Sequence, residues 1–212
     1  MTLNLDAMTG DIERAIRSIE AEYRCNKGLI LTESDLASLV YARLRSLFLN
    51  PSNSSGLRWR MPTQDPSIRA SPLHLEVPWY DDNNKLRIRP DITILDPAHL
   101  SILHRVDGKL RLPSKQFQFE GNAIILELKF IRYKSGITLP ILERIERDFR
   151  KIEADLLPLH NHGSSLYCFF VVFNKTNNKC SEFDCYLKDH AHGSWYKYMY
   201  ASGHIAFNRR LA

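Results

Sequence analysis

Several features that mark particular classes of protein are missing from this sequence of 212 residues. The longest apolar run, Leu166–Phe173, is far shorter than the roughly 20 residues that a membrane-spanning helix needs, so we expect no membrane partner. The four cysteines form no CxxC pair and no regular framework, which is typical of a reducing compartment. The N-terminus lacks a charged segment followed by an apolar one, so we expect a cytoplasmic rather than a secreted protein.

Several functional motifs are missing as well. The chain has no internal repeat, no glycine-rich phosphate cradle, no nucleophile elbow and no zinc-finger spacing. Its composition is that of an ordinary globular chain, with 44% hydrophobic and 25% charged residues. The net charge of +5 and the pI near 9.0 favour a polyanionic partner, because clustered Lys and Arg attract phosphate groups.

Apolar periodicity predicts an α/β fold. We expect a helix that begins near Thr9 or Asp11, a second helix with Thr32 as its N-cap, a third at 139–156, and strands at Leu73–Tyr80, Leu86–Leu95, Asn122–Ile131 and Ser165–Asn174. A helix between the last two strands indicates a crossover and a parallel pair. We therefore expect one domain over residues 1–212, with an N-terminal packing helix (1–30), a core (31–174) and a C-terminal extension (175–212).

Two segments connect these elements. Asn50–Pro72 is rich in Pro, Ser and Asn and is expected to be a long loop, while Asp81–Asn84 is expected to be the turn between the first two strands. The stretch Asp96–Gly121 is less regular and contains a minor hairpin around Val106–Leu110. We expect this insertion to lie outside the core sheet.

Two of the expected strands carry charge where a buried strand should not. Asp91 follows Pro90 in the expected strand Leu86–Leu95. Glu127 and Lys129 lie two residues apart in the expected strand Asn122–Ile131, so these two side chains share one face of the strand. Burying a carboxylate or an ammonium costs free energy unless it is paired, binds metal or reacts. These residues are therefore the first candidates for a functional site.

If the two strands are neighbours, Asp91 and Glu127 converge and repel each other unless a cation or a proton lies between them. Oxygen ligands without an accompanying His or Cys favour Mg²⁺ or Mn²⁺ over zinc. The backbone carbonyl of Leu128 could supply a further ligand, and Glu76 could be another acid around the site. Lys129 would lie beside the metal-bound water, an arrangement suited to phosphodiester hydrolysis.

Pro90-Asp91 followed by Glu127-Leu128-Lys129 resembles the signature of the PD-(D/E)xK nuclease superfamily, the fold of many restriction endonucleases and Holliday-junction resolvases. The resemblance implies a mixed β-sheet flanked by helices, with a core order of helix, three strands, helix and strand. It implies that Asp91 and Glu127 are metal ligands and that Lys129 is the catalytic lysine. In this pattern Glu33 is the nearest match to an acid of the first core helix, and the second core helix supplies Asp148 and Lys151.

The function that follows is a metal-dependent endonuclease acting on DNA rather than RNA, in restriction, repair or a mobile element. Cuts on both strands need two sites, so we expect a homodimer. The residues expected to contact the nucleic acid are Arg58, Arg60, Arg89 and Lys151. An acid within the first turn of the second helix, Asp35, is more simply explained as a complement to the helix dipole.

Three alternatives remain open at this point. The chain could be a nuclease-like subunit that binds nucleic acid, or takes part in an assembly, without cutting the nucleic acid. Its net positive charge and its tyrosine-rich tail allow this. The loop around Trp59 could be a solvated loop anchored by that side chain, and the aromatic tail could be a closing layer of packing. Glu127 and Lys129 could also be a structural ion pair in an unrelated α/β domain.

Overall fold

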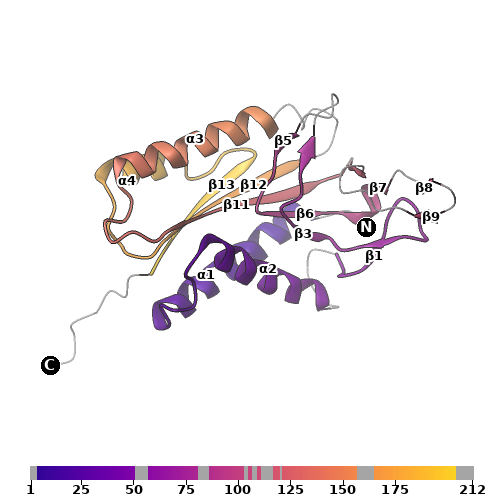
Figure 1. Ribbon diagram of the computed structural model, residues 1–212, viewed down its shortest axis with the longest axis horizontal. Helices are drawn as coiled ribbons and strands as arrows, with labels where there is room; N and C mark the ends of the chain where they lie inside the picture. Colours follow the sequence, from indigo (N-terminus) through magenta and orange to yellow (C-terminus); the bar gives the residue numbers. More distant parts are fainter. Residues whose placement is uncertain are drawn as a thin grey trace.

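The structure is a computed structural model that describes residues 4–50, 57–80, 86–102, 105–106, 109–110, 117–119, 121–156 and 165–203. The described residues form four α-helices, Leu5–Cys25 (α1), Glu33–Leu49 (α2), Leu139–Leu156 (α3) and Ser181–Asp189 (α4), and a short 3-10 helix, Pro97–His99 (η1). They accompany a five-stranded mixed sheet. The expected α/β class is therefore confirmed, and helices flank the sheet on both faces (Figure 1).

The main sheet has the strand order β13-β12-β11-β6-β3. Its strands are Leu73–Leu75 (β3), Ile92–Leu95 (β6), Ala123–Ile131 (β11), Leu166–Asn174 (β12) and Tyr196–Ser202 (β13). β3, β6 and β11 are antiparallel neighbours, whereas β11, β12 and β13 are parallel. Helix α3 makes the crossover from β11 to β12, as the sequence predicted.

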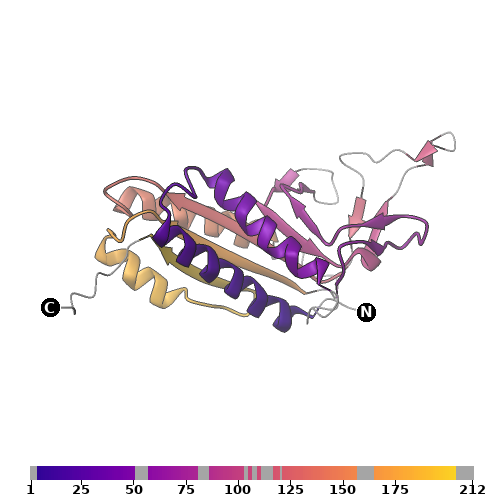
Figure 2. The same cartoon turned by 90° about the horizontal axis from the view of Figure 1, so that it is seen from below.

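Each face of the sheet has its own apolar core. Seen from below, α1 and α2 lie across one face (Figure 2), where their side chains pack against the even-numbered residues of β11, including Leu126 and Leu128. Helices α3 and α4 lie across the other face, against residues such as Ile125 and Phe170. Because β11 is covered on both faces, only Glu127 and Lys129 among its nine residues are not fully buried. The charged pair is thus set within the central strand.

Both expected hairpin strands are broken, which corrects their predicted bounds. The first divides into β3 and Trp79–Tyr80 (β4), and the second into Leu86–Ile88 (β5) and β6; β4 pairs with β5 in a separate two-stranded sheet. Glu76 lies after β3 with φ 50°, a left-handed conformation that a strand cannot contain. In the second expected strand, Pro90 lacks the backbone N–H that would donate a hydrogen bond to a neighbouring strand. The turn at 81–84 lies outside the described residues.

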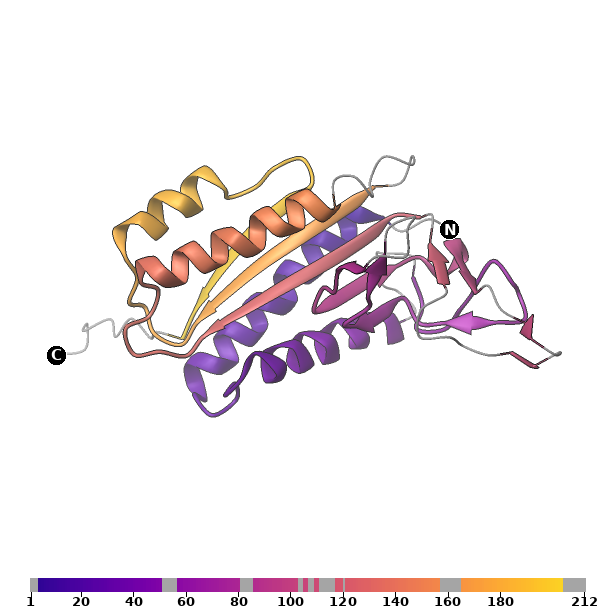
Figure 3. The ribbon, with the colours of Figure 1, turned by 45° about the horizontal axis from the view of Figure 1, so that its top comes forward.

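Smaller sheets lie at one end of the main sheet (Figure 3). They pair Met61–Pro62 (β1) with Arg69–Ala70 (β2), Leu100–Ile102 (β7) with Phe117–Phe119 (β10), and Arg105–Val106 (β8) with Lys109–Leu110 (β9). The insertion 96–121 therefore stays outside the main sheet wherever it is described, and its minor hairpin is confirmed. The expected long loop contains the β1–β2 hairpin in its described part, while 51–56 lie outside the described residues.

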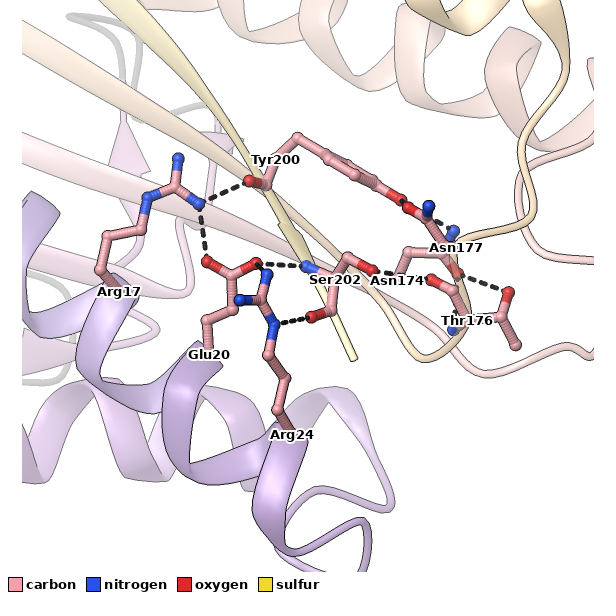
Figure 4. Close-up of polar contacts among 8 residues, drawn as sticks. All are labelled: Arg17, Glu20, Arg24, Asn174, Thr176, Asn177, Tyr200 and Ser202. Atoms are coloured by element: carbon pink, nitrogen blue, oxygen red, sulfur yellow. Dashed lines mark hydrogen bonds and ion pairs between the residues drawn. The ribbon is translucent and has the colours of Figure 1, made fainter. Parts of the chain in front are cut away.

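Helix α1 is tied to the edge strand β13 by a buried carboxylate (Figure 4). Glu20, only 6% exposed, accepts hydrogen bonds from Arg17, Arg24 and the backbone N–H of Ser202. Arg17 also donates to the carbonyl of Tyr200 and Arg24 to that of Ser202. These contacts satisfy the open edge of β13, so the expected C-terminal extension contributes a strand of the main sheet.

We expect Glu20→Ala to lower the free energy of unfolding by about 2–4 kcal/mol, because it removes the acceptor of a buried backbone N–H and the carboxylate that pairs with Arg17 and Arg24. Glu22→Ala on the same helix is the matched control, since Glu22 is 43% exposed and pairs with Arg43 at the surface. Its cost should stay below about 1 kcal/mol. Urea unfolding followed by circular dichroism measures both, and equal losses would contradict the role of Glu20.

Candidate active site

The site begins where β6 separates from β11. The two strands pair only as far as Ile92 opposite Leu126, and Asp91 then turns away from the ladder. Its Oδ2 accepts a 2.7 Å hydrogen bond from the backbone N–H of Leu128, the group that the next residue of a longer β6 would have bound. At the same corner the N–H of Glu76 donates to the carbonyl of Asp91 at 3.1 Å. The bend in the hairpin therefore fixes Asp91 against β11.

A second carboxylate reaches the same edge of β11 from helix α2. Oε2 of Glu33 accepts the backbone N–H of Phe130 at 3.0 Å. Glu33 is held there because α2 begins with a capping box, in which Thr32 and Asp35 exchange side-chain and backbone hydrogen bonds. Asp35 is used entirely in this cap, as the helix-terminus interpretation predicted, and it is Glu33 that lies at the candidate site.

Lys129 links the strand to helix α3. Its Nζ lies 3.1 Å from Oε1 of Glu127 and 3.1 Å from Oδ2 of Asp148. All three side chains are partly buried, with 24% of Lys129, 15% of Glu127 and 33% of Asp148 exposed. The ammonium is thus held between two carboxylates on the face of β11 that α3 covers.

Burial and mutual repulsion perturb the carboxyls at this corner. Burial, supported by the charges of Glu33 and Glu76, raises the pKa of Asp91 to about 6 even though the Leu128 N–H favours the ionised form. Burial and the charge of Asp91 raise the pKa of Glu127 to about 7. Burial acts to lower the pKa of Lys129, but the surrounding carboxylates outweigh it and raise that pKa above its ordinary value. The lysine therefore stays charged at neutral pH.

The donor set is suited to a hard divalent cation. Asp91 uses Oδ2 for the Leu128 N–H, and a carboxylate has a second oxygen that can bind a cation. The raised pKa values of Asp91 and Glu127 mark two acids whose ionised forms lack sufficient positive charge nearby. Among the described residues, no three His, Cys, Asp or Glu side chains already form a complete metal-holding group. The acids pair instead with Lys129 and with strand N–H groups.

An open groove leads to these acids from the side of β5 and α3. It has an empty volume of about 1250 Å³ and carries Glu127 and Asp148 at one end. The basic side chains in its walls are Arg87, Arg89 and Lys151. Arg89 and Lys151 were predicted to contact nucleic acid, and the structure brings both to the groove.

Other predicted residues lie elsewhere. Glu76 is exposed at the bend, close enough for its charge to act on Asp91. Arg58 and Arg60 flank Trp59, whose N–H binds the carbonyl of Phe48 near the end of α2. The length of α2, about 25 Å, separates that end from Glu33. The structure therefore does not bring Arg58 and Arg60 to the acid cluster.

Trp59 and the aromatic tail both have packing roles. Trp59 packs edge-on against Tyr41 and beneath the guanidinium of Arg45, which anchors its loop to α2. In the tail, Trp195 stacks on Phe149 of α3, and Tyr198 stacks on Phe170 of β12. The packing alternatives for the loop and for the tail are thus supported.

Sequence reasoning missed Arg87. It lies in the groove wall, 3.8 Å from Asp155, and alternates along β5 with the buried Ile88. The alternation Arg87-Ile88-Arg89 was readable in the sequence as two basic residues on one strand face. What was lacking was the knowledge that α3 lies opposite that face.

Comparisons with known proteins add no family assignment: no family model, no curated protein and no solved structure matches this chain. Within the described ranges, none of the helices combines the length and apolar character needed to cross a membrane. The function of the chain is therefore inferred from the geometry of the site.

We expect Asp91→Asn to stabilise the protein in EDTA at pH 8, because the amide can still accept the Leu128 N–H but adds no charge to the cluster. The pKa of Asp91 in the folded protein, about 6, exceeds the ordinary value of 3.8, so ionisation costs stability as the pH rises from about 4 to about 6. The gain in melting temperature should therefore vanish near pH 4. A lower melting temperature for the variant at both pH values would contradict this account.

Proposed function

We propose that this chain is a metal-dependent nuclease that hydrolyses phosphodiester bonds in DNA. The observation that carries the proposal is the convergence of Asp91, Glu127 and Lys129 at the point where β6 separates from β11. Two acids with raised pKa values and one charged lysine at the end of an open groove are a combination typical of catalytic sites.

The element order supports assigning the fold to the restriction endonuclease-like type. Helix α2, strands β3, β6 and β11, helix α3 and strand β12 follow one another in the chain. This is the order of helix, three strands, helix and strand that the resemblance to PD-(D/E)xK nucleases implies. Glu127 and Lys129 lie on the third of those strands and Asp91 directly precedes the second, in agreement with the order of the signature.

In this proposal Asp91, Glu127 and the carbonyl of Leu128 would hold Mg²⁺ or Mn²⁺. When bound, such an ion polarises a phosphoryl oxygen and lowers the pKa of a coordinated water. Lys129 supplies a fixed positive charge that orients the attacking water and offsets charge on the phosphorus as the bond forms. Asp148 holds the ammonium of Lys129 at 3.1 Å and so acts as its positioning residue.

The proposal predicts nicking of plasmid DNA that needs Mg²⁺ and stops in EDTA. Lys129→Met and Glu127→Gln should each lower the rate by at least about 100-fold, since each removes a charge from the reacting centre. Lys134→Met, which alters an exposed lysine of the following loop, is the matched control and should cut normally. Gel electrophoresis of supercoiled plasmid measures all four proteins.

Two results would oppose the proposal. Cleavage that persists in EDTA, or that survives both substitutions, would point to a contaminating or different activity. Tight and salt-sensitive DNA binding without cleavage of any substrate would instead support the alternative of a binding or assembly subunit. Melting curves of each variant exclude unfolding as the cause of a loss.

We expect Asp148→Asn to lower kcat by about 10–100-fold with little change in KM, the usual size of effect for a residue that orients a reactive group. The amide cannot form the ion pair that holds Lys129, but it has nearly the same shape. Glu146→Gln is the control on the same helix, because Glu146 pairs with Arg150 at the surface. A change in KM alone would assign Asp148 to substrate binding instead.

A further inference from the structure

The groove beside the candidate site has a mixed lining that is more specific than a basic surface. Helix α3 contributes Asp148, Lys151, Ile152 and Asp155, which share one helical face over about 10 Å of helix. Strand β5 and the residue after it contribute Leu86, Arg87, Ile88 and Arg89 along the opposite wall. Glu127 is also among the residues that line the groove, so a ligand in the groove would contact this acid directly.

The charges of the groove favour a polyanion. Arg89 and Lys151 are exposed, and Arg87 pairs with Asp155 at 3.8 Å with 40% of its own side chain exposed. An exposed ion pair of this length contributes little stability, so a phosphate group can replace Asp155 as the partner of Arg87 at small cost. The acids at the other end are bound to Lys129, which limits their repulsion of an incoming phosphate.

The converging walls and the apolar residues of the groove favour one strand over two. Some Cα atoms of α3 lie within 8 Å of those of β5, so the walls meet at the base of the groove. A B-form duplex is wider than its own major groove of about 12 Å, so it would lie across the rim rather than between walls that converge. Ile88 and Ile152 form the buried floor, and Leu86 is 44% exposed at the rim. Single-strand sites combine basic groups for phosphates with apolar surface for unpaired bases.

We infer that this groove binds a single-stranded segment of DNA and leads it to Glu127. That the strand is led to a catalytic acid rests on the proposed nuclease function, whereas binding in the groove needs no hydrolysis. The substrate is then a single strand, or a duplex that offers an unpaired segment, as a negatively supercoiled plasmid does. A blunt duplex is bound only through its exterior phosphates and does not reach the acids through the groove.

The test is a fluorescence anisotropy titration in EDTA, where no cleavage occurs. The probes are labelled oligo(dT) of roughly 20 nucleotides, longer than a typical single-strand site, a blunt duplex of the same length, and the matching oligo(U). We expect oligo(dT) to bind at least about tenfold more tightly than the duplex and no more weakly than oligo(U). Lys151→Ala and Arg89→Ala should each weaken that binding about fivefold and reduce its salt dependence by about 0.7 in the log–log slope.

Arg150→Ala is the matched control, because Arg150 lies on α3 with 76% of its side chain exposed and lines no part of the groove. Its affinity for oligo(dT) should equal that of the unaltered protein. Tighter binding of the duplex or of oligo(U), or an equal loss in Arg150→Ala, would overturn the inference. Melting temperatures of the surface variants should be unchanged.

Cleavage assays with Mg²⁺ on supercoiled plasmid and on circular single-stranded DNA separate the two proposals. Groove-dependent binding of oligo(dT) without Mg²⁺-dependent cleavage of either DNA would support the single-strand site and overturn the nuclease function. Cleavage of either DNA, together with oligo(dT) binding that is unchanged in Lys151→Ala and Arg89→Ala, would support the nuclease function and overturn the single-strand site.

Discussion

The need of every buried backbone N–H for a partner organises the candidate site. β6 stops pairing with β11 at Leu126, although β11 continues to Ile131 between two helical layers. The N–H groups of Leu128 and Phe130 then face an edge without a strand, and carboxylates of Asp91 and Glu33 take the place of the missing carbonyls. This exchange brings negative charge into the interior.

The charge at this corner is balanced only in part. Lys129 lies between Glu127 and Asp148, while Glu33 and Asp91 remain close to it. The carboxyls of Asp91 and Glu127 respond with raised pKa values, which means that their ionised forms destabilise the fold at neutral pH. A cluster of buried acids that costs stability in this way is a candidate for binding or catalysis.

Local signals predicted the regular elements well and the hairpin poorly. Thr32 caps α2 as expected, and α3 covers the predicted range, because capping and helical periodicity depend on neighbours within a few residues. The alternation of apolar residues over 73–80 predicted one strand and not the positive φ of Glu76, since that conformation accompanies the separation of β3 and β4 into two sheets. The place of β13 in the main sheet was missed for a related reason. The contacts that hold this edge strand come from Glu20 and its arginines on α1, which lie far from β13 in the sequence.

The sequence by itself determined which residues carry anomalous charge: Asp91 after Pro90, and Glu127 with Lys129 on one strand face. Side-chain alternation is a local property, so it could be read without a fold. Tertiary structure decided which distant residues join them: Glu33 rather than Asp35, and Asp148 from α3. It also places Arg87, Arg89 and Lys151 in one groove and leaves Arg58 and Arg60 apart from it. These choices depend on how helices pack across a sheet, which no short stretch of sequence records.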